Sequence, residues 1–583
     1  MFMFGYSQRI RSTLVAGFFT KNTYLVDEPK LLKMNLNKSL AFLLLASIII
    51  ICFGNKKLPD TKPNILLVMA DDMGYSDLGC YGGEINTPNL DKLAKNGIRF
   101  TQFYNTARCC PTRASLMTGL YPHEAGEGYM TGRNMGPGYL GFLNDSCVTI
   151  AEVLEKAGYF TGMVGKWHAG NNRESWPENR GFKHFWGIHN YIDSYFKVLN
   201  NCEVFYNGKI VIHQNDYPKI GASSNKEWYT TDVFTNKAIE FIDLAIREKK
   251  PFFQYVAYNA PHWPLEAHDD VIEKYLEKYK AGYESLRIQK YRRMIKMGIV
   301  SDQWQLPKRT MPAWDSLSDS LKLDTEFRRA IYAAQIEIMD QNIGRLVTHL
   351  NEKGVLDNTV IIFLSDNGCS AEPEDNIFGY QWGKNTRWNY QEWRRNSARA
   401  GASQGMVWAI TSNSPYKRYK KFTHEGGIST PLIVHWPNGI KKPGTFDDKP
   451  GHIVDIMATC CELANATYPR LRNGIPVKKM RGISLVPNFK GAESLKHKTI
   501  FWEHEGHGAL RMGKWKLVSV NPRDQSKWEL YDMEKDRTEI HDLSTLFPEK
   551  RDEMIKKWIE IAYETKALPW PDLSNAKRNP VEK

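Results

Sequence analysis

The sequence predicts an α/β fold, with a mostly parallel central sheet flanked by helices and a smaller C-terminal α+β subdomain. Three observations predict it. Short apolar segments recur along the first 480 residues, each directly beside polar residues, as expected of strands buried on both faces of a sheet. Amphipathic helical patterns lie between these segments. After about residue 480 the pattern changes to antiparallel strands and one closing helix.

The first 54 residues are expected to be an upstream extension followed by a signal peptide. Residues 1–33 carry no pattern that predicts a fold. From Met34, a short positive region leads into an apolar run at residues 40–53, too short to span a bilayer comfortably, and then the small residue Gly54. We therefore expect translation to start at Met34 and the protein to be periplasmic or secreted, with no stable membrane span. A buried helix is one alternative. Lipid anchoring at Cys52 is another, although four isoleucines precede that cysteine.

The net charge of +13 favours anionic partners. Residues 1–54 carry six Lys/Arg against two acidic residues, so the exported part keeps +9. No Lys/Arg block could track a phosphate backbone, which argues against a nucleic-acid partner. The nine cysteines show no zinc-site spacing. They leave room for one or two disulfides, whose pairing the sequence does not define.

Five apolar segments predict strands of the central sheet: residues 64–69, 161–164, 252–258, 360–364 and 431–435. Helical patterns between them cover residues 89–96, 150–157, 232–246 and 325–353. Ligands of such sheets bind beyond the carboxyl ends of the strands. This rule places seven polar residues along one edge: Asp71, Asp72, Lys166, His168, His262, Asp366 and Asn367.

The domain division follows from the same patterns. Residues 57–480 are expected to form the catalytic α/β domain, with a helical insertion at 266–330. This insertion is expected near the edge of the sheet that carries the seven polar residues, called the active edge below. Residues 481–583 are expected to form the C-terminal subdomain, with two antiparallel strands at 508–520 and 528–532 and a closing helix at 548–565.

A reactive side chain is expected at Cys109. Pro111 suits the first turn of a helix, so Cys109 lies at a helix N-terminus, where the dipole favours negative charge. Arg113 lies about one turn further on and can reach the same helix end. A buried structural cysteine pair, Cys109 with Cys110, is the plainer interpretation of this segment alone.

The acidic residues at the active edge predict a metal site. Asp71, Asp72, Asp366 and Asn367 offer oxygen ligands, which suit Ca²⁺ or Mg²⁺ and not Zn²⁺. Three carboxylates at one edge would repel one another unless a cation lay among them. Each pair alone could equally be a turn or a helix cap.

Cations and proton carriers form the other half of the candidate site: Arg113, Lys166, Lys420, His168 and His262. Together they would neutralise an anionic tetrahedral group and move protons to and from it. Each has an ordinary alternative, such as a solvated lysine or a histidine packed in a turn.

These segments together resemble the formylglycine-dependent sulfatases of the arylsulfatase family, which are related to alkaline phosphatases. The family signature Cys-x-Pro-Ser/Thr-Arg is present at residues 109–113, with Thr112 where serine is commoner. The other family blocks also occur: Asp71-Asp72-Met73-Gly74-Tyr75, Gly165-Lys166-Trp167-His168, Ala260-Pro261-His262, Ser365-Asp366-Asn367-Gly368, and Lys420 five residues before Glu425-Gly426-Gly427. The similarity extends from about residue 62 to residue 543.

The resemblance implies that a maturation enzyme oxidises Cys109 to formylglycine, whose hydrate attacks sulfur. It implies a divalent ion, Ca²⁺ in preference to Mg²⁺, held by Asp71, Asp72, Asp366, Asn367 and the modified Cys109. It further implies the following roles: Lys166 and Lys420 stabilise the sulfuryl oxygens, His262 or Lys420 protonates the leaving alcohol, His168 takes a proton from the second hydroxyl, and Arg113 holds the diol.

The expected function is hydrolysis of sulfate esters of small molecules or glycans. Two alternatives are also compatible with the sequence: a phosphodiester or phosphonate monoester hydrolase with the same nucleophile, and a non-catalytic binder of sulfated glycans. Residues 181–235, 266–330 and 503–507 are expected to line the substrate entrance. The identity of the substrate is not encoded in any motif.

Overall fold

The computed structural model describes residues 62–571, except 193, 199–201, 214–227, 309, 373–402 and 493–496, together with the backbone of residues 577–578. The predicted extension and signal peptide, including Cys52, lie outside the described residues. Across the part that is described, no helix has both the length and the apolar character needed to cross a bilayer. The eight described cysteines are all buried, and none of them is in a disulfide.

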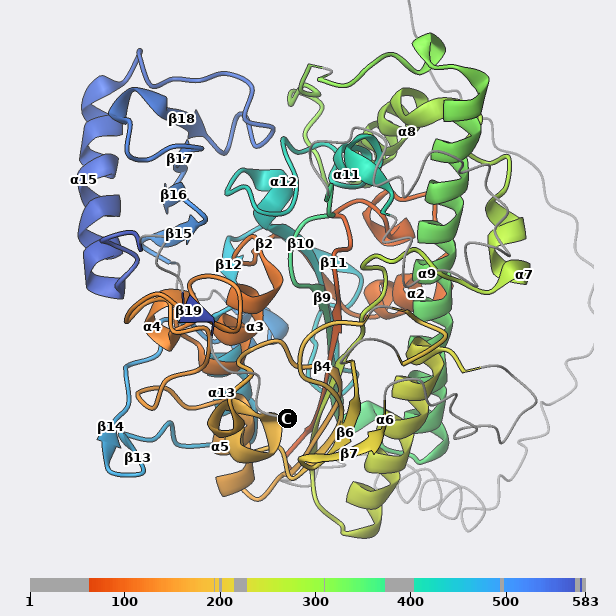
Figure 1. The fold of residues 1–583 in the computed structure, drawn as a ribbon, viewed down its shortest axis with the longest axis vertical. Coiled ribbons are helices and arrows are strands. Elements are labelled where there is room, and N and C mark those ends of the chain that lie inside the picture. The colour runs from red at the N-terminus through yellow and green to blue at the C-terminus, as the bar shows by residue number, and fades with distance from the viewer. Residues whose placement is uncertain are drawn as a thin grey trace, which may run out of the picture. The chain divides into compact units, whose positions relative to one another are not determined.

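A large mixed sheet forms the centre of the structure (Figure 1). Its spatial order is β11 (Thr445–Asp447), β2 (Ile98–Tyr104), β10 (Ser429–His435), β9 (Thr359–Ser365), β1 (Asn64–Ala70), β8 (Phe252–Ala257), β4 (Phe160–Lys166), β5 (His184–Ile188), β6 (Val204–Tyr206) and β7 (Lys209–Ile212), with β12 (Gly451–His452) also paired to β2. The five strands from β9 to β5 are parallel to one another. The predicted α/β class with a mostly parallel sheet is therefore confirmed.

The strand β10 runs antiparallel to both of its neighbours, β9 and β2. Its first residues therefore lie at the edge where the parallel strands end. This explains why polar residues precede this strand in the sequence, whereas they follow the other four predicted strands.

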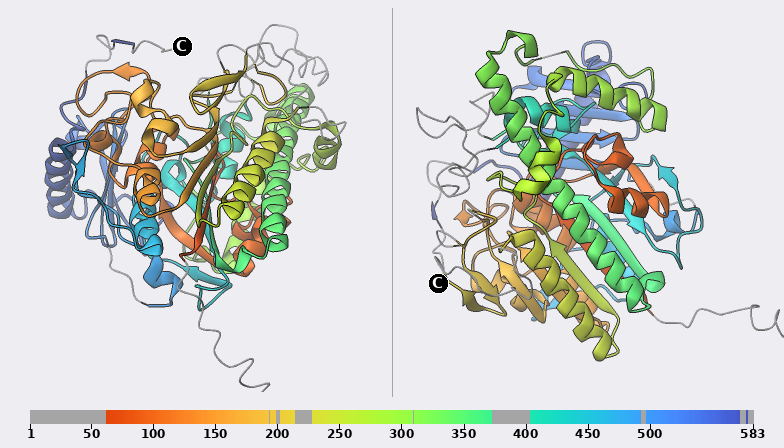
Figure 2. Two further views of the ribbon diagram at one scale, coloured as in Figure 1. Left: turned by 90° about the horizontal axis from the view of Figure 1, so that it is seen from below. Right: turned by 90° about the vertical axis from the view of Figure 1, so that its right-hand side faces the viewer.

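Two helical layers cover the sheet because alternate strand residues point to opposite faces. Leu66 and Val68 of β1 pack into one core with α2 (Pro88–Lys95), α6 (Thr230–Arg247), α8 (Gly282–Met297), α9 (Asp319–Glu352) and α11 (Gly405–Ser412). Ile65 and Leu67 pack into the other core with α3 (Cys109–Thr118), α5 (Ile150–Lys156), α13 (Asp455–Ala464) and α14 (Val486–Phe489). Figure 2 shows α6 and α9 side by side across one face.

The four predicted helices of the catalytic domain are present as α2, α5, α6 and α9. The helix α9 begins at Asp319, where Ser318 accepts a hydrogen bond from the backbone of Leu321 as an N-cap. The described residues of the predicted insertion contain helices and no strand. They are α7 (Asp269–Ile272), α8, the start of α9 and the 3₁₀ turns Glu273–Tyr275 and Trp314–Ser316.

Shorter elements complete this part of the chain. They are the helices α4 (Pro122–Ala125) and α12 (Glu425–Ile428), the strands β3 (Arg133–Asn134), β13 (Leu471–Arg472), β14 (Ile475–Pro476) and β19 (Lys577–Arg578), and the 3₁₀ turns Gly79–Tyr81, Arg173–Ser175, Pro177–Arg180, Leu356–Asn358 and Gln525–Lys527.

The C-terminal region is a four-stranded antiparallel sheet packed against a helix. Its strands follow one another as β15 (Ile500–His504), β16 (His507–Met512), β17 (Trp515–Ser519) and β18 (Trp528–Asp532). The closing helix α15 (Pro548–Thr565) is confirmed at both ends. The prediction of two strands was wrong, because residues 508–520 fold back on themselves at a two-residue turn where Gly513 has a φ of 59°.

Candidate active site

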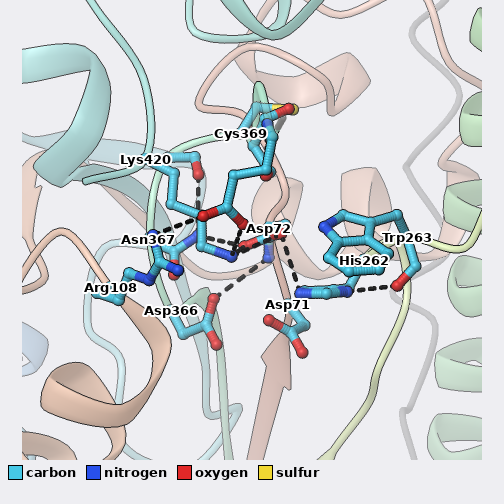
Figure 3. A network of polar contacts seen from close by, with 12 residues as sticks. Asp71, Asp72, Arg108, His262, Trp263, Asp366, Asn367, Cys369 and Lys420 are labelled. Carbon is cyan, nitrogen blue, oxygen red and sulfur yellow. Dashed lines mark hydrogen bonds and ion pairs between the residues drawn. The ribbon is translucent and has the colours of Figure 1, made fainter. Parts of the chain in front are cut away.

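The carboxyl ends of β1 and β9 bring four predicted residues together. The register of the two strands pairs Ala70 with Ser365, so Asp71-Asp72 and Asp366-Asn367 leave the sheet side by side. Lys166 is the last residue of β4, and His262 follows β8 by five residues. Figure 3 shows Asp71, Asp72, Asp366 and Asn367 close together, with Lys420 and His262 facing them. The predicted edge therefore contains the residues that the sequence assigned to it.

Two of these residues have left-handed backbone conformations. The φ angles of Asp72 and His168 are 67° and 53°. Such angles cost free energy in residues other than glycine and persist only where the surroundings impose them. The backbone N–H of Asp72 donates to Asp366 (3.2 Å), and that of His168 donates to the carbonyl of His189 (2.8 Å). The backbone is thus held so that both side chains face the site.

Lysine and arginine side chains neutralise the buried carboxylates. Lys166 Nζ lies 2.6 Å from Asp71 Oδ2, and Lys420 Nζ lies 2.9 Å from Asp72 Oδ1. Burial alone would raise the pKa of Asp71, but Lys166, His262 and Arg113 hold it well below its usual value. Burial raises the pKa of Asp366 well above its usual value, and Asp71 beside it adds to the effect.

Arg113 is fully buried behind the carboxylates. Its Nε and Nη2 atoms both donate to Asp366 Oδ2, at 3.1 and 2.8 Å, and Nη1 donates to the carbonyl of Lys166 (2.8 Å). The side chain therefore fixes the end of β9 relative to the end of β4. This contact with Asp366 was not among the roles expected from the sequence.

Among the candidate metal ligands, Asp71 Oδ1 and Asn367 Oδ1 are buried oxygen atoms with no hydrogen-bond partner in the part of the chain that the structure describes. Unpaired buried oxygens are costly unless a donor or a cation satisfies them. Carboxylate oxygens of Asp71 and Asp72 and a ring nitrogen of His262 lie within 4.8 Å of one another. The donor set is rich in oxygen and fits a hard divalent cation.

Cys109 is the first residue of α3, as expected from Pro111. Its side chain is buried. A hydrogen bond from Cys110, together with His168 and Lys166, holds the pKa of Cys109 well below its usual value. Burial raises the pKa of Cys110 well above its usual value, so the two neighbouring thiols differ in character. Burial lowers the pKa of His168 to about 4, which leaves a neutral imidazole beside Cys109 at neutral pH.

His262 contacts the carboxylate of Asp72 through one of its ring nitrogens. Its Nδ1 donates to the carbonyl of Trp263, and its Nε2 lies 3.5 Å from Asp72 Oδ2. The Nε2 atom is thus the one that faces the site, as Figure 3 shows.

Four charged residues near the site were not among the predicted site residues. Glu372 bridges Arg108 Nη1 (2.6 Å) and Lys420 Nζ (3.5 Å). Glu505 lies 4.0 Å from Arg108 and 3.6 Å from Lys421. Arg108 and Lys421 adjoin Cys109 and Lys420 in sequence, and this adjacency is the signal that could have revealed them. Glu505 belongs to the predicted entrance segment 503–507, whereas no pattern marks Glu372.

The site combines a thiol at a helix start, paired cations and an oxygen-rich donor set at the carboxyl edge of a parallel sheet. These groups suit a hydrolase of esters of tetrahedral anions, because cations stabilise the negative charge of such a group. The sulfatase family model matches residues 63–466, and that of the N-sulphoglucosamine sulphohydrolase C-terminal region matches residues 417–562. The chain belongs to the sulfatase family and is a sulfuric ester hydrolase.

Similar proteins agree with this assignment. An uncharacterised sulfatase of Schizosaccharomyces pombe is 33% identical over 89% of this chain and 96% of its own. An arylsulfatase of Klebsiella aerogenes is 33% identical over 73% of this chain and 91% of its own. The crystal structure of Ps i-CgsB with k-i-k-neocarrahexaose is 26% identical, with a TM-score of 0.62 over 88% of this chain and 96% of its own. Members of the family generally use a formylglycine residue and a divalent metal ion.

Proposed function

We propose that this sulfatase hydrolyses sulfate esters of carbohydrates, with formylglycine formed from Cys109 and with Ca²⁺ as the divalent ion. The observation that carries the proposal is the position of Cys109. It begins a helix at the point where two lysines, two histidines and an oxygen-rich donor set converge. A hydrated aldehyde at this position would supply two hydroxyls on one carbon, one to attack sulfur and one to assist the release of sulfate.

The calcium ligands in this proposal are Asp71, Asp72, Asp366, Asn367 and the modified Cys109. The unpaired oxygens of Asp71 and Asn367 support it, because a cation would satisfy both. When bound, the ion would neutralise negative charge on the reacting group. Arg113 supports the same arrangement, since its two hydrogen bonds to Asp366 Oδ2 help to orient that carboxylate.

The remaining residues have roles in charge neutralisation and proton transfer. Lys166 and Lys420 point their ammonium groups at the carboxylate pair, where they would also meet the sulfuryl oxygens. His262 Nε2 or Lys420 would donate a proton to the leaving alcohol. His168, beside Cys109, would accept a proton from the second hydroxyl.

Carbohydrate substrates are favoured by the similar proteins and by the entrance. N-acetylgalactosamine-6-sulfatases of dog and human are 26% and 27% identical, and the similar structure of Ps i-CgsB is a complex with k-i-k-neocarrahexaose. Near Cys109, Arg108, Glu372, Glu505 and Lys421 present both charges, which suits hydroxyl groups and a second sulfate on a sugar.

Two further steps belong to this proposal. A maturation enzyme converts Cys109 to formylglycine, and the protein is exported by a signal that begins at Met34. N-terminal sequencing of the secreted or periplasmic protein should find no peptide from residues 1–33. Recovery of such a peptide from native protein would contradict the start at Met34.

The decisive experiment combines mass spectrometry with substrate comparison. The peptide containing residue 109 should carry the mass of formylglycine in active enzyme. Cys109→Ala should abolish hydrolysis, and Cys109→Ser should give at most a trapped covalent ester, whereas Cys110→Ser is the matched control and should retain turnover. Full turnover by either Cys109 variant would refute the mechanism.

The substrate is tested with a panel of sulfated mono- and oligosaccharides, an aryl sulfate and an aryl phosphate diester. The proposal expects the highest kcat/KM on one of the sulfated sugars. A higher kcat/KM on the phosphate diester would favour the phosphoester alternative instead.

A further inference from the structure

We propose that Tyr332, held in place by Asp77, is a positioning residue that joins the two metal-binding loops and thereby sets the affinity for the divalent ion. The inference rests on the metal site proposed above. Neither residue would touch the ion. Tyr332 lies on α9 and Asp77 lies in the loop after β1, and both are fully buried.

The hydroxyl of Tyr332 contacts both loops that carry the candidate ligands. It donates to Asp77 Oδ2 (2.8 Å) and accepts from the backbone N–H of Gly74 (3.3 Å), both in the loop that begins with Asp71 and Asp72. It also lies 3.4 Å from the sulfur of Cys369, two residues beyond Asn367 in the loop after β9. One phenol group thus spans the two ligand loops.

Cys369 extends this connection to a third loop. Its backbone N–H donates to the side chain of Asn413 (2.9 Å), and its carbonyl accepts from the backbone N–H of Lys420 (3.1 Å). Figure 3 shows Cys369 beside Lys420. A shift of Tyr332 would therefore reach the two ligand loops and the lysine that contacts Asp72.

Asp77 is itself fixed by two buried cations. Lys290 Nζ of α8 and Arg329 Nη2 of α9 each lie 2.8 Å from Asp77 Oδ1. Arg329 and Tyr332 are three residues apart on α9, so they share one face of that helix. Arg329 also contacts Glu84 (2.7 Å) and the hydroxyl of Ser412 (2.7 Å). Such a network has few alternative arrangements, because moving one member leaves a buried charge unpaired.

The loop after β1 needs this support because its backbone is strained at Asp72. Asp72 has a φ of 67°, and its carbonyl lies 3.3 Å from the hydroxyl of Tyr332. Without the hydroxyl, the loop gains freedom to leave that conformation, and the ion must then reorganise it on binding. Partners one step beyond the metal ligands typically change metal affinity by about 10–100-fold when they are mutated.

A purely structural role makes a different prediction from a positioning role. A residue that only fills the core lowers the unfolding temperature without changing the affinity of the folded protein for an ion. Tyr332→Phe removes the hydroxyl and keeps the ring, so packing is largely conserved. Tyr159→Phe is the matched control, since Tyr159 is also buried but its hydroxyl donates to the carbonyl of Pro63 (2.9 Å), ahead of β1 and away from the ligand loops.

The test is calorimetric titration of Ca²⁺, with Mg²⁺ in parallel, into the mature full-length protein stripped of metal with a chelator. Wild type and Tyr159→Phe should bind with the same Kd. Tyr332→Phe should bind roughly 10-fold more weakly or worse. Its kcat should recover at saturating Ca²⁺. Cys369→Ala removes the other end of the contact and should shift the Kd in the same direction.

The outcomes separate the two proposals. If wild type binds Ca²⁺ and Tyr332→Phe binds it equally well, this inference is overturned and the metal site stands. Lost activity of Tyr332→Phe with an unchanged Kd overturns it in the same way. If wild type binds neither ion, the proposed metal site fails and this inference fails with it.

Discussion

Glu127 is a buried carboxyl group that the proposed reaction does not use. Thr131 donates its hydroxyl to Glu127 Oε1 (2.7 Å), and Oε2 has no hydrogen-bond partner among the described residues. Burial raises the pKa of Glu127 to about 8, and Cys109 nearby contributes to the increase. The group is therefore protonated in the folded protein under conditions where it would be ionised in the unfolded chain.

This difference predicts a pH dependence of stability. Below the unfolded pKa of about 4.5 the contribution is fully present. Between about 4.5 and 8 the folded protein binds the extra proton, so the free energy of unfolding falls as pH rises, by at most about 1.4 kcal/mol per pH unit from this group. Glu127→Gln should flatten that part of the profile measured by urea unfolding. Glu549→Gln, at an exposed site on α15, is the control, and a parallel profile for both variants would contradict the assignment.

The placement of the candidate site residues at one edge of the sheet could be predicted from the sequence. The polar residues after β1, β4, β8 and β9 could be assigned to one edge because parallel strands end together. Glu372 could not be found in this way. It reaches Arg108 and Lys420 through the fold, and no spacing in the sequence encodes that meeting.

At the level of elements, the strand β4 ends in Lys166 and is followed closely by His168. The residue before Lys166, Gly165, has no room for a side chain. Gly165 has a φ of 100°, and a Cβ placed there would lie 2.0 Å from the carbonyl oxygen of Ala257 on β8. The two strands therefore approach each other closely at the residue before Lys166.

Gly165→Ala should therefore damage both folding and activity. The added methyl must push β4 away from β8 and strain the backbone, for an expected loss of roughly 2–4 kcal/mol in the free energy of unfolding. Gly158→Ala is the matched control, because Gly158 has a φ of 87° but nothing within 4 Å of its Cβ position, so backbone strain of about 1–2 kcal/mol is its whole cost. Equal losses in chemical denaturation would show that the contact with Ala257 is unimportant.

Helices and strands were predicted well where the apolar periodicity was strong. They were predicted less well where the pairing of strands determines their bounds or direction. The helix α15 matched at both ends because its apolar face repeats over 18 residues. The strands β16 and β17 were merged, since the turn between them contains only Gly513 and Lys514. The direction of β10 could not be predicted, because strand direction depends on the neighbour with which a strand pairs.

At the level of the whole molecule, a buried ionic cluster joins the C-terminal sheet to the central one. Lys516 of β17 contacts Glu425 (2.8 Å), which lies just before β10, and Glu539 (2.7 Å). Arg537 contacts Glu425 on its other oxygen (2.9 Å). Burial would raise the pKa of Glu425, but Lys516 and Arg537 lower it to about 2. The predicted boundary near residue 480 stays a prediction, and this cluster would lie across it.

Lys516→Met should destabilise the protein by about 3–5 kcal/mol, because it leaves two buried carboxylates without their shared partner. Lys514→Met is the control: that lysine is largely exposed and pairs with Asp532 at 3.0 Å, so a change within about 1 kcal/mol is expected. Thermal unfolding of both variants at neutral pH decides the question. A similar unfolding temperature for both variants would mean that the cluster contributes little.

Glu425 also predicts that the stability of the wild type declines as pH falls from about 4.5 towards 2, since protonation of Glu425 removes its ion pairs.

The position of Lys290 has a consequence for engineering. Residues 266–330, predicted to be an insertion near the substrate entrance, would be a natural segment to exchange when a new substrate is sought. Yet its helix α8 supplies a buried ammonium group to Asp77, behind the loop that begins with Asp71. If the whole segment were replaced by one chosen only for its solvent-facing residues, Asp77 would lose the counterion that Lys290 supplies. Successful chimeras should therefore keep α8 and exchange only the loops that it supports.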